Sequence, residues 1–297
     1  MRSFFQRSLS SLVGGFALFL LLTVACSQQP KLSRNTPEYQ YAQIKKALSD
    51  LKYEKIINQS NEFISKFPDS PYADKARILR IVLLVGLGDS YKSLAEAYVD
   101  GFDKSTKNAG QLRATAYDYY RKQKNTALGI YGGCEYFLIN FSENTPYVLE
   151  CDFPGKDVVS NSKLDEVRKG NLLDSEQQKI AEDSEVDNGI IRALASFLGD
   201  AEDRAKARKL MESGSKPLDH AEFIVRLGRI LLENQKLFGR SALNEIQPFR
   251  QFTQKASECA EIALKILKDK PNEEIQKRAD SLKTELETSK KSSAKSP

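Results

Sequence analysis

Apolar residues recur at helical spacing over most of the chain. Tyr41, Ile44 and Leu48 lie at positions i, i+3 and i+7, and a second apolar stripe runs from Ile56 to Phe67. The segment FPDSPYA, which begins at Phe67, contains two prolines and an Asp/Ser pair, as is typical of the junction between two helices. The pattern therefore predicts a first pair of helices followed by a break.

The next apolar run predicts a third helix over Tyr72–Val85. The sequence Gly86–Asp89, GLGD, is typical of a turn, and a fourth helix is expected over Tyr91–Phe102. Helix–turn–helix units of this period are typical of tetratricopeptide repeats. The alternative is a generic helical bundle whose turns happen to use Pro and Asp. Both interpretations predict an all-α fold.

The middle of the chain is less regular. Gln111–Lys124 still predicts a helix, whereas Gly129–Pro154 is rich in aromatic and β-branched residues around the break Ser142–Pro146. We expect two strands and a loop there, a small β-hairpin around residues 130–153. The alternative is one helix that ends at the same break. Gly155–Lys169 resembles a polar linker.

Helical periodicity returns after residue 170. It predicts five helices, over Ser175–Phe197, Ala201–Met211, Leu218–Leu237, Ser241–Asp269 and Asn272–Glu287. Asp219 is expected to cap one of these helices, and a polar tail over residues 288–297 is expected to be disordered.

The N-terminal residues follow a different pattern. Arg2 and Arg7 precede the apolar run Leu12–Ala25, which has the length of a signal peptide and is short for a membrane span of roughly 20 apolar residues. Cys26 ends this run, and polar residues follow. An uncleaved anchor, or an ordinary secretory signal followed by an incidental cysteine, would have the same pattern.

The residues TVAC, which end at Cys26, resemble the lipobox of bacterial lipoproteins, although Thr23 stands where that family usually has Leu. The resemblance implies that a signal peptide, residues 1–25, is removed and that the Cys26 thiol carries diacylglycerol. Because Ser27 follows the cysteine, it also implies export to the outer membrane, with the protein facing the periplasm. Residues 26–37 would be the lipidated linker.

The segment Tyr53–Ala76, YEKIINQSNEFISKFPDSPYADKA, resembles the repeats of tetratricopeptide outer-membrane lipoproteins such as the D subunit of the β-barrel assembly machine. Leu51, Lys52 and Ile56 depart from the small residues usual in those repeats. The resemblance covers about residues 38–104 and implies a solenoid of helical hairpins. On this interpretation residues 105–170 form an irregular segment and residues 171–287 form C-terminal helical repeats.

Charge and composition add little about partners. The net charge is +5, and Lys and Arg alternate with Asp and Glu along most of the chain, so no nucleic-acid-binding face is indicated. The single histidine, His220, lies beside the expected cap Asp219 and is interpreted as structural. No phosphate loop and no His/Cys metal spacing is present, so we expect no enzyme activity, cofactor or metal.

The cysteines allow one candidate disulfide. Cys134 and Cys151 both lie in the expected hairpin, and export would permit a bond between them. A hairpin centred near Asn144, however, places Cys134 opposite about residue 154 and out of register with Cys151. Cys259 lies among small residues and is interpreted as a buried core thiol.

Two functions fit these observations. The first is a lipid-anchored scaffold that binds an extended peptide or another envelope protein, and the second is a ligand-binding accessory subunit of a solute transporter. An open polar groove favours the scaffold, whereas an apolar pocket beside the aromatic segment favours the transporter subunit. The candidate partner-binding residues are Tyr39, Tyr41, Tyr72, Arg80, Tyr136 and Phe137.

Overall fold

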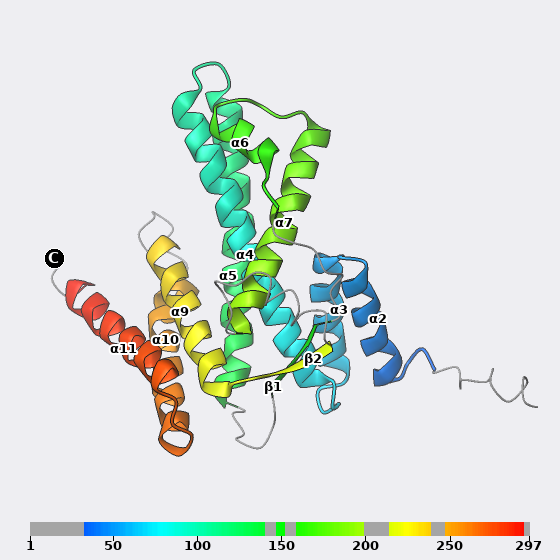
Figure 1. The fold of residues 1–297 in the computed structure, drawn as a ribbon, viewed down its shortest axis with the longest axis vertical. Coiled ribbons are helices and arrows are strands. Elements are labelled where there is room, and N and C mark those ends of the chain that lie inside the picture. Colours follow the sequence, from blue (N-terminus) through cyan, green and yellow to red (C-terminus); the bar gives the residue numbers. More distant parts are fainter. Residues whose placement is uncertain (1–32, 140–146, 152–158, 199–213, 239–246, 294–297) are drawn as a thin grey trace, which may run out of the picture.

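A computed structural model describes residues 33–139, 147–151, 159–198, 214–238 and 247–293 (Figure 1). The described chain is mostly helical, which confirms the all-α class. In chain order its elements are α2 (Pro37–Ser49), α3 (Tyr53–Lys66), α4 (Ala73–Lys104), α5 (Ala109–Ile139), β1 (Tyr147–Cys151), α6 (Ser162–Arg168), α7 (Ser175–Phe197), β2 (Gly214–Leu218), α9 (His220–Phe238), α10 (Gln247–Asp269) and α11 (Glu273–Ser293). The predicted signal peptide, Cys26 and the helix predicted over residues 201–211 lie outside the described residues.

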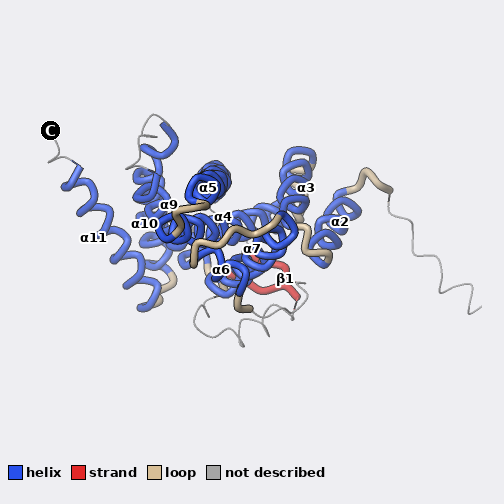
Figure 2. Tube along the Cα trace, turned by 90° about the horizontal axis from the view of Figure 1, so that it is seen from above, coloured by secondary structure: helices blue, strands red, loops and turns tan. Residues whose placement is uncertain are grey.

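Three helices, α4, α5 and α7, form the centre of the molecule (Figures 1 and 2). The hairpin of α2 and α3 packs on one side of this centre, and α9, α10 and α11 form a C-terminal module on the other side. The short α6 packs against α4. None of the described helices is both long and apolar enough to cross a lipid bilayer.

The α2–α3 hairpin forms where the sequence predicts it. The side chain of Thr36 caps α2 by accepting a hydrogen bond from the Tyr39 backbone N–H at 3.3 Å, and Pro37 supplies a fixed φ at the first turn. Leu51 adopts a left-handed backbone with φ of 57° in the tight connection to α3. The FPDSP segment then separates α3 from α4, as expected.

The predicted turn at Gly86–Asp89 is wrong. These residues lie inside α4, which is continuous over 32 residues and therefore about 48 Å long. The reason is a tertiary contact: a Cβ at Gly86 would lie 2.7 Å from the Ile190 Cα of α7. Gly86 lets α4 and α7 approach closely, so the second predicted helical pair is one helix, and the repeat array stays a prediction.

The predicted local hairpin around residues 130–153 is also wrong. Residues 130–139 complete α5, and they bury Ile130, Cys134 and Phe137 at helical spacing against the core. Much of the segment predicted to be irregular, residues 105–170, is therefore helical, and α6 lies within the part interpreted as a linker.

The strand in this region pairs with a distant partner. β1 runs antiparallel to β2, with Tyr147 opposite Leu218 and Leu149 opposite Lys216. Pro217 is accommodated because each strand of a two-stranded sheet has an unpaired edge. The sheet lies beside the lower end of α4 in Figure 1, and β2 leads directly into α9 at the start of the C-terminal module.

Two helices of the C-terminal module, α9 and α11, begin with side-chain caps. Asp219 Oδ1 accepts a hydrogen bond from the Glu222 backbone N–H at 2.9 Å, which confirms the expected cap. Asn272 Oδ1 accepts from the backbone N–H groups of Glu274 and Ile275 before α11. The helix α11 continues to Ser293, so residues 288–293 of the expected disordered tail are helical.

Candidate functional site

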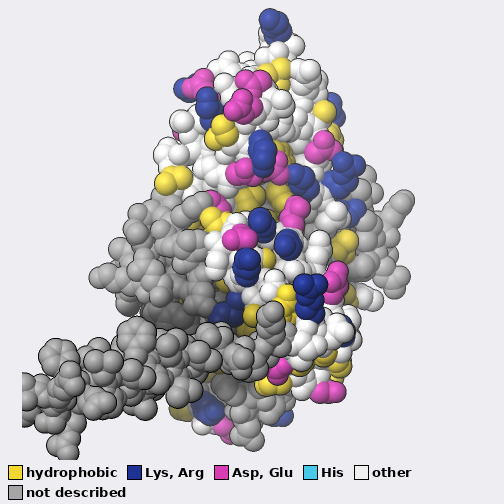
Figure 3. Space-filling view, turned by 90° about the vertical axis from the view of Figure 1, so that its right-hand side faces the viewer, with side chains coloured by type: hydrophobic (Ala, Val, Ile, Leu, Met, Phe, Trp, Pro, Cys, Tyr) yellow, Lys and Arg dark blue, Asp and Glu magenta, His cyan; other side chains and the backbone are white. Residues whose placement is uncertain are grey.

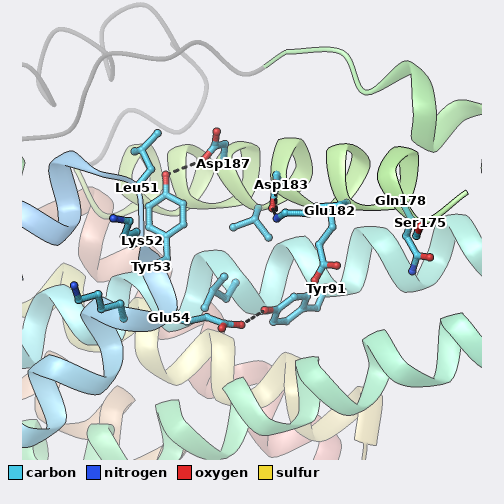
Figure 4. Close-up of a pocket in the computed structure, with 14 residues that line it drawn as sticks. Leu51, Lys52, Tyr53, Glu54, Tyr91, Ser175, Gln178, Glu182, Asp183 and Asp187 are labelled. Carbon is cyan, nitrogen blue, oxygen red and sulfur yellow. Dashed lines mark hydrogen bonds and ion pairs between the residues drawn. The ribbon is translucent and has the colours of Figure 1, made fainter. Parts of the chain in front are cut away.

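A cavity with many polar side chains in its lining lies between α3, α4 and α7, and we call it the α3–α7 cleft. Its volume is about 830 Å³, and it opens to the surface beside the start of α3 (Figure 4). It is lined by Leu51, Lys52, Tyr53, Glu54, Lys55, Leu87, Tyr91, Ser175, Gln178, Lys179, Glu182, Asp183, Val186 and Asp187.

Close packing of α7 on α4 builds one wall of the cleft. A Cβ at Gly189 would lie 2.5 Å from the carbonyl oxygen of Gly86, and the buried Ser90 hydroxyl donates a hydrogen bond to that same oxygen at 2.8 Å. Because the backbones almost touch there, the preceding turns of α7 hold their polar side chains facing α3 and α4.

Tyrosine hydroxyls join the walls to each other. Tyr53 of α3 donates to Asp187 of α7 at 2.9 Å, and Tyr91 of α4 lies 3.5 Å from a carboxylate oxygen of Glu54 in α3 (Figure 4). Each hydrogen bond connects two different helices, so together they fix the width of the cleft.

A partly exposed cation beside the cleft holds Glu182, one of the lining residues. Lys122 of α5 forms an ion pair with Glu182 at 2.5 Å, and Tyr119 donates to the same carboxylate at 3.3 Å. The Lys122 ammonium also lies 5.3 Å from the ring centroid of Tyr91 and 5.1 Å from that of Tyr119, within the range of cation–π attraction.

The cleft tyrosines are held in their neutral form. Burial raises the pKa of Tyr53, Tyr91 and Tyr119 well above the ordinary value, and the neighbouring carboxylates raise it further. These phenols therefore donate hydrogen bonds at neutral pH and do not supply a base. The arrangement suits binding through fixed hydrogen-bonding groups.

The cleft lining carries charges of both signs. Lys179 pairs with Asp183 at 2.8 Å across one helical turn, whereas Glu54 is exposed at the rim. Figure 3 shows Lys and Arg side chains mixed with Asp and Glu on one face of the molecule. On that face a continuous basic stripe of the kind that binds nucleic acid does not form.

The residues predicted to bind a partner lie elsewhere. Tyr41 and Phe137 are only 3% and 1% exposed, so they belong to the core and are corrected as contact residues. Tyr41 stacks on Tyr72, and Tyr136 donates to Asp74 at 2.7 Å. Tyr39, Tyr72, Arg80 and Tyr136 are half-buried, and none of the six lines the cleft.

The sequence carries no local signal for the cleft. Tyr53 begins the segment that resembles a tetratricopeptide repeat, and Tyr91 begins the expected fourth helix. Glu182 and Asp187 lie on one helix, α7. Nothing local in the sequence indicates that Asp187 accepts a hydrogen bond from Tyr53, which is 134 residues away.

The cysteines and the histidine also have defined places. Cys134 is a free, buried thiol whose Sγ lies 3.6 Å from the Sγ of Cys259, so the candidate bond to Cys151 is not the arrangement observed. His220 Nε2 accepts a hydrogen bond from the Tyr147 backbone N–H at 3.2 Å, a structural role. Among the described residues, no three His, Cys, Asp or Glu side chains form a metal-binding group.

Comparison with known proteins assigns no family. No family model, no curated protein and no solved structure matches the chain.

Proposed function

We propose that this protein is a lipid-anchored helical scaffold of a bacterial cell envelope that binds an extended segment of a partner protein in the α3–α7 cleft. The observation that carries this proposal is the cleft itself, an open polar groove whose tyrosines are fixed by carboxylates from neighbouring helices. A groove of this kind is the feature expected of a scaffold.

The cleft favours a peptide because its contact groups are already positioned. Tyrosine is enriched in protein interfaces, and side chains that are ordered before binding lose less conformational entropy on association. The exposed carboxylate of Glu54 at the rim, with Asp187 deeper in the cleft, favours a segment that carries Lys or Arg.

The N-terminal sequence supports the location. A lipid chain contributes about 0.8 kcal/mol per buried CH₂, and more than one chain gives stable membrane attachment. The linker between Cys26 and Pro37 can extend at most about 40 Å, which would keep the helical domain next to the outer-membrane surface, where envelope proteins are within reach.

The repeat architecture is part of the same proposal. The α2–α3 hairpin contains most of the segment that resembles a tetratricopeptide repeat, and α10–α11 is a second pair joined by a proline-containing turn. We propose that these two hairpins are tetratricopeptide-like repeats.

One observation favours the alternative of a ligand-binding transporter subunit. A smaller cavity of about 380 Å³ lies between α4, α5, α7 and α9, and Gln123 lines it. The Gln123 side-chain oxygen is buried and has no hydrogen-bond partner among the described residues. A small ligand with a hydroxyl or amino group would supply that partner.

Photo-crosslinking in intact cells tests the scaffold. A photoreactive residue at Lys55, which lines the cleft, should give an adduct with a specific envelope protein, whereas the same residue at Glu62, exposed on the same helix outside the cleft, should not. The adduct should disappear in Cys26→Ala, which lacks the lipid attachment site. Adducts of equal yield from both positions, or none from either, would contradict the proposal.

A further inference from the structure

Two cysteines far apart in the sequence meet in the core. Cys134 in α5 and Cys259 in α10 are separated by 125 residues, and their Sγ atoms lie 3.6 Å apart. Both side chains are fully buried. The contact lies where the C-terminal module packs against the central helices.

The surrounding contacts fix the two helices in this register. Tyr131 stacks on Phe252 with ring centroids 4.9 Å apart, and Lys255 lies 3.7 Å from a carboxylate oxygen of Glu135. These pairs come from the helical turns next to the cysteines on α5 and α10. The sulfur contact is therefore part of a specific interface between the two helices.

A third helix, α9, packs against Cys259 on the side away from α5. A Cβ at Gly228 of α9 would lie 2.8 Å from the Cys259 Cβ, so α9 passes directly against this residue. Cys259 has no room to move toward α9, and its sulfur faces α5. The two Sγ atoms are 3.6 Å apart, and a disulfide bond is about 2.0 Å long, so a small movement of the two side chains would bring the sulfurs to bonding distance.

We propose that Cys134 and Cys259 form a disulfide bond in the exported protein and that this bond covalently joins α5 to α10. The two thiols together give up two protons and two electrons, and a disulfide of the oxidising compartment, carried by a protein or a small molecule, accepts them and leaves as two thiols. The inference rests on the export part of the proposed function, because such oxidants act outside the cytosol.

Burial determines when the bond forms. The hydrogen bond with Cys134 and the loss of solvent raise the pKa of the Cys259 thiol, so little of the reactive thiolate exists in the folded protein. The bond forms during folding, while the sulfurs are still accessible. Once formed, it is shielded from reductants by the same burial.

The bond has a structural consequence for the C-terminal module. The module, α9 to α11, follows residues 199–213 in the chain and contacts the rest of the described protein mainly through α5. A bond that closes a loop of 125 residues restricts the unfolded chain strongly and ties the module to α5. Reduction should lower the melting midpoint by roughly 5–10 °C.

Thiol trapping on the full-length chain tests the inference. The chain is expressed with its leader in a Gram-negative host, denatured in the presence of N-ethylmaleimide without reductant, and mapped by mass spectrometry. We expect a linked pair of peptides that contain Cys134 and Cys259, and a maleimide adduct on Cys151. The variant C151S should keep the link, and C134S should leave Cys259 labelled.

Two results would overturn the inference: maleimide on both Cys134 and Cys259 without reduction, or a link from either of them to Cys151. The intact mass reports separately whether the leader has been removed and Cys26 lipidated. If the leader is retained and the chain stays in the cytosol, the export part of the proposed function fails, and the purified chain is denatured, reduced and refolded in a glutathione redox buffer. A Cys134–Cys259 link after refolding then supports the pairing, and its absence rejects it.

Discussion

The central helices and the C-terminal module hold their helices together in different ways. In the centre, Gly86 and Gly189 bring the backbones of α4 and α7 almost into contact, with the Ser90 hydroxyl between them. In the module, the buried carboxylate of Glu222 pairs with Arg226 at 2.5 Å and Arg278 at 3.1 Å. Small residues fix one backbone separation in the centre, whereas the ion pair of Glu222 with Arg278 fixes α9 relative to α11 in the module.

The two kinds of helix contact should respond differently to substitution. A contact made by glycines leaves no side chain that can be rearranged, so the wall of the α3–α7 cleft is rigid. A buried ion pair instead depends on complete pairing, because each unpaired charge has a large desolvation cost. The centre should therefore be sensitive to added volume, and the module should be sensitive to removed charge.

The largest effect is expected from Gly189→Ala. The new Cβ would meet the Gly86 carbonyl oxygen at 2.5 Å and clash with Ser90, so we expect a loss of about 3 kcal/mol in the free energy of unfolding. The matched control is Gly132→Ala in α5, where no atom lies within 4 Å and helix propensity predicts a gain of about 0.5–1 kcal/mol. Urea denaturation measures both, and similar changes for the two variants would reject the close-contact account.

The next largest effect is expected from Glu222→Ala. The substitution leaves the half-buried Arg226 without its carboxylate partner, and burial already lowers the pKa of that guanidinium. We expect a loss of about 2–3 kcal/mol, against less than about 0.5 kcal/mol for Glu274→Ala, an exposed partner of Arg278. Equal losses of unfolding free energy for the two variants in chemical denaturation would show that burial does not strengthen the dependence of stability on Glu222.

A smaller effect is expected from the buried tyrosines at high pH. Burial, with help from Glu182, raises the pKa of Tyr98 to about 12. The folded state disfavours the tyrosinate, so the stability contributed by neutral Tyr98 is complete below about pH 10 and is lost as the pH rises toward 12. Tyr98→Phe should flatten the fall of the melting midpoint over this range, and an unchanged slope would contradict the assignment.

The smallest effect is expected from Tyr53→Phe, which removes only the hydroxyl that bonds to Asp187. We expect a loss of about 1 kcal/mol in the free energy of unfolding, because a single partly buried hydrogen bond disappears. Tyr117→Phe removes a hydroxyl from a residue that is 61% exposed and should change nothing measurable. If both variants unfold alike in urea, the Tyr53 bond does not hold the cleft walls.

Local sequence patterns predicted those parts of the fold that depend on local physics. The helix over Ser175–Phe197 has the expected bounds, and the cap at Asp219 is present. The expected turn at Gly86 failed because glycine serves a helix contact as readily as a turn, and only the position of α7 distinguishes the two. β1 pairs with β2 across more than sixty residues, a distance over which strand periodicity carries no information.

The candidate site depended even more on tertiary structure. Its two walls come from Tyr53–Glu54 and from the acidic face of α7 around Glu182, and the sequence shows both only as charged helix surfaces. Aromatic residues that the sequence predicted to bind a partner, such as Phe137, are buried in the core. A surface site built from ordinary polar residues has no local signature.

The central claim is that the α3–α7 cleft binds the partner, and co-purification of a charge-reversed chain tests it most directly. Glu54→Lys reverses a charge at the rim of the cleft, and Glu62→Lys makes the same change at an exposed position of α3 outside it. With both lipidated variants melting within a few degrees of the parent, we predict that Glu54→Lys loses the co-purifying envelope protein and that Glu62→Lys retains it. Equal recovery of that protein with the two variants would contradict the account.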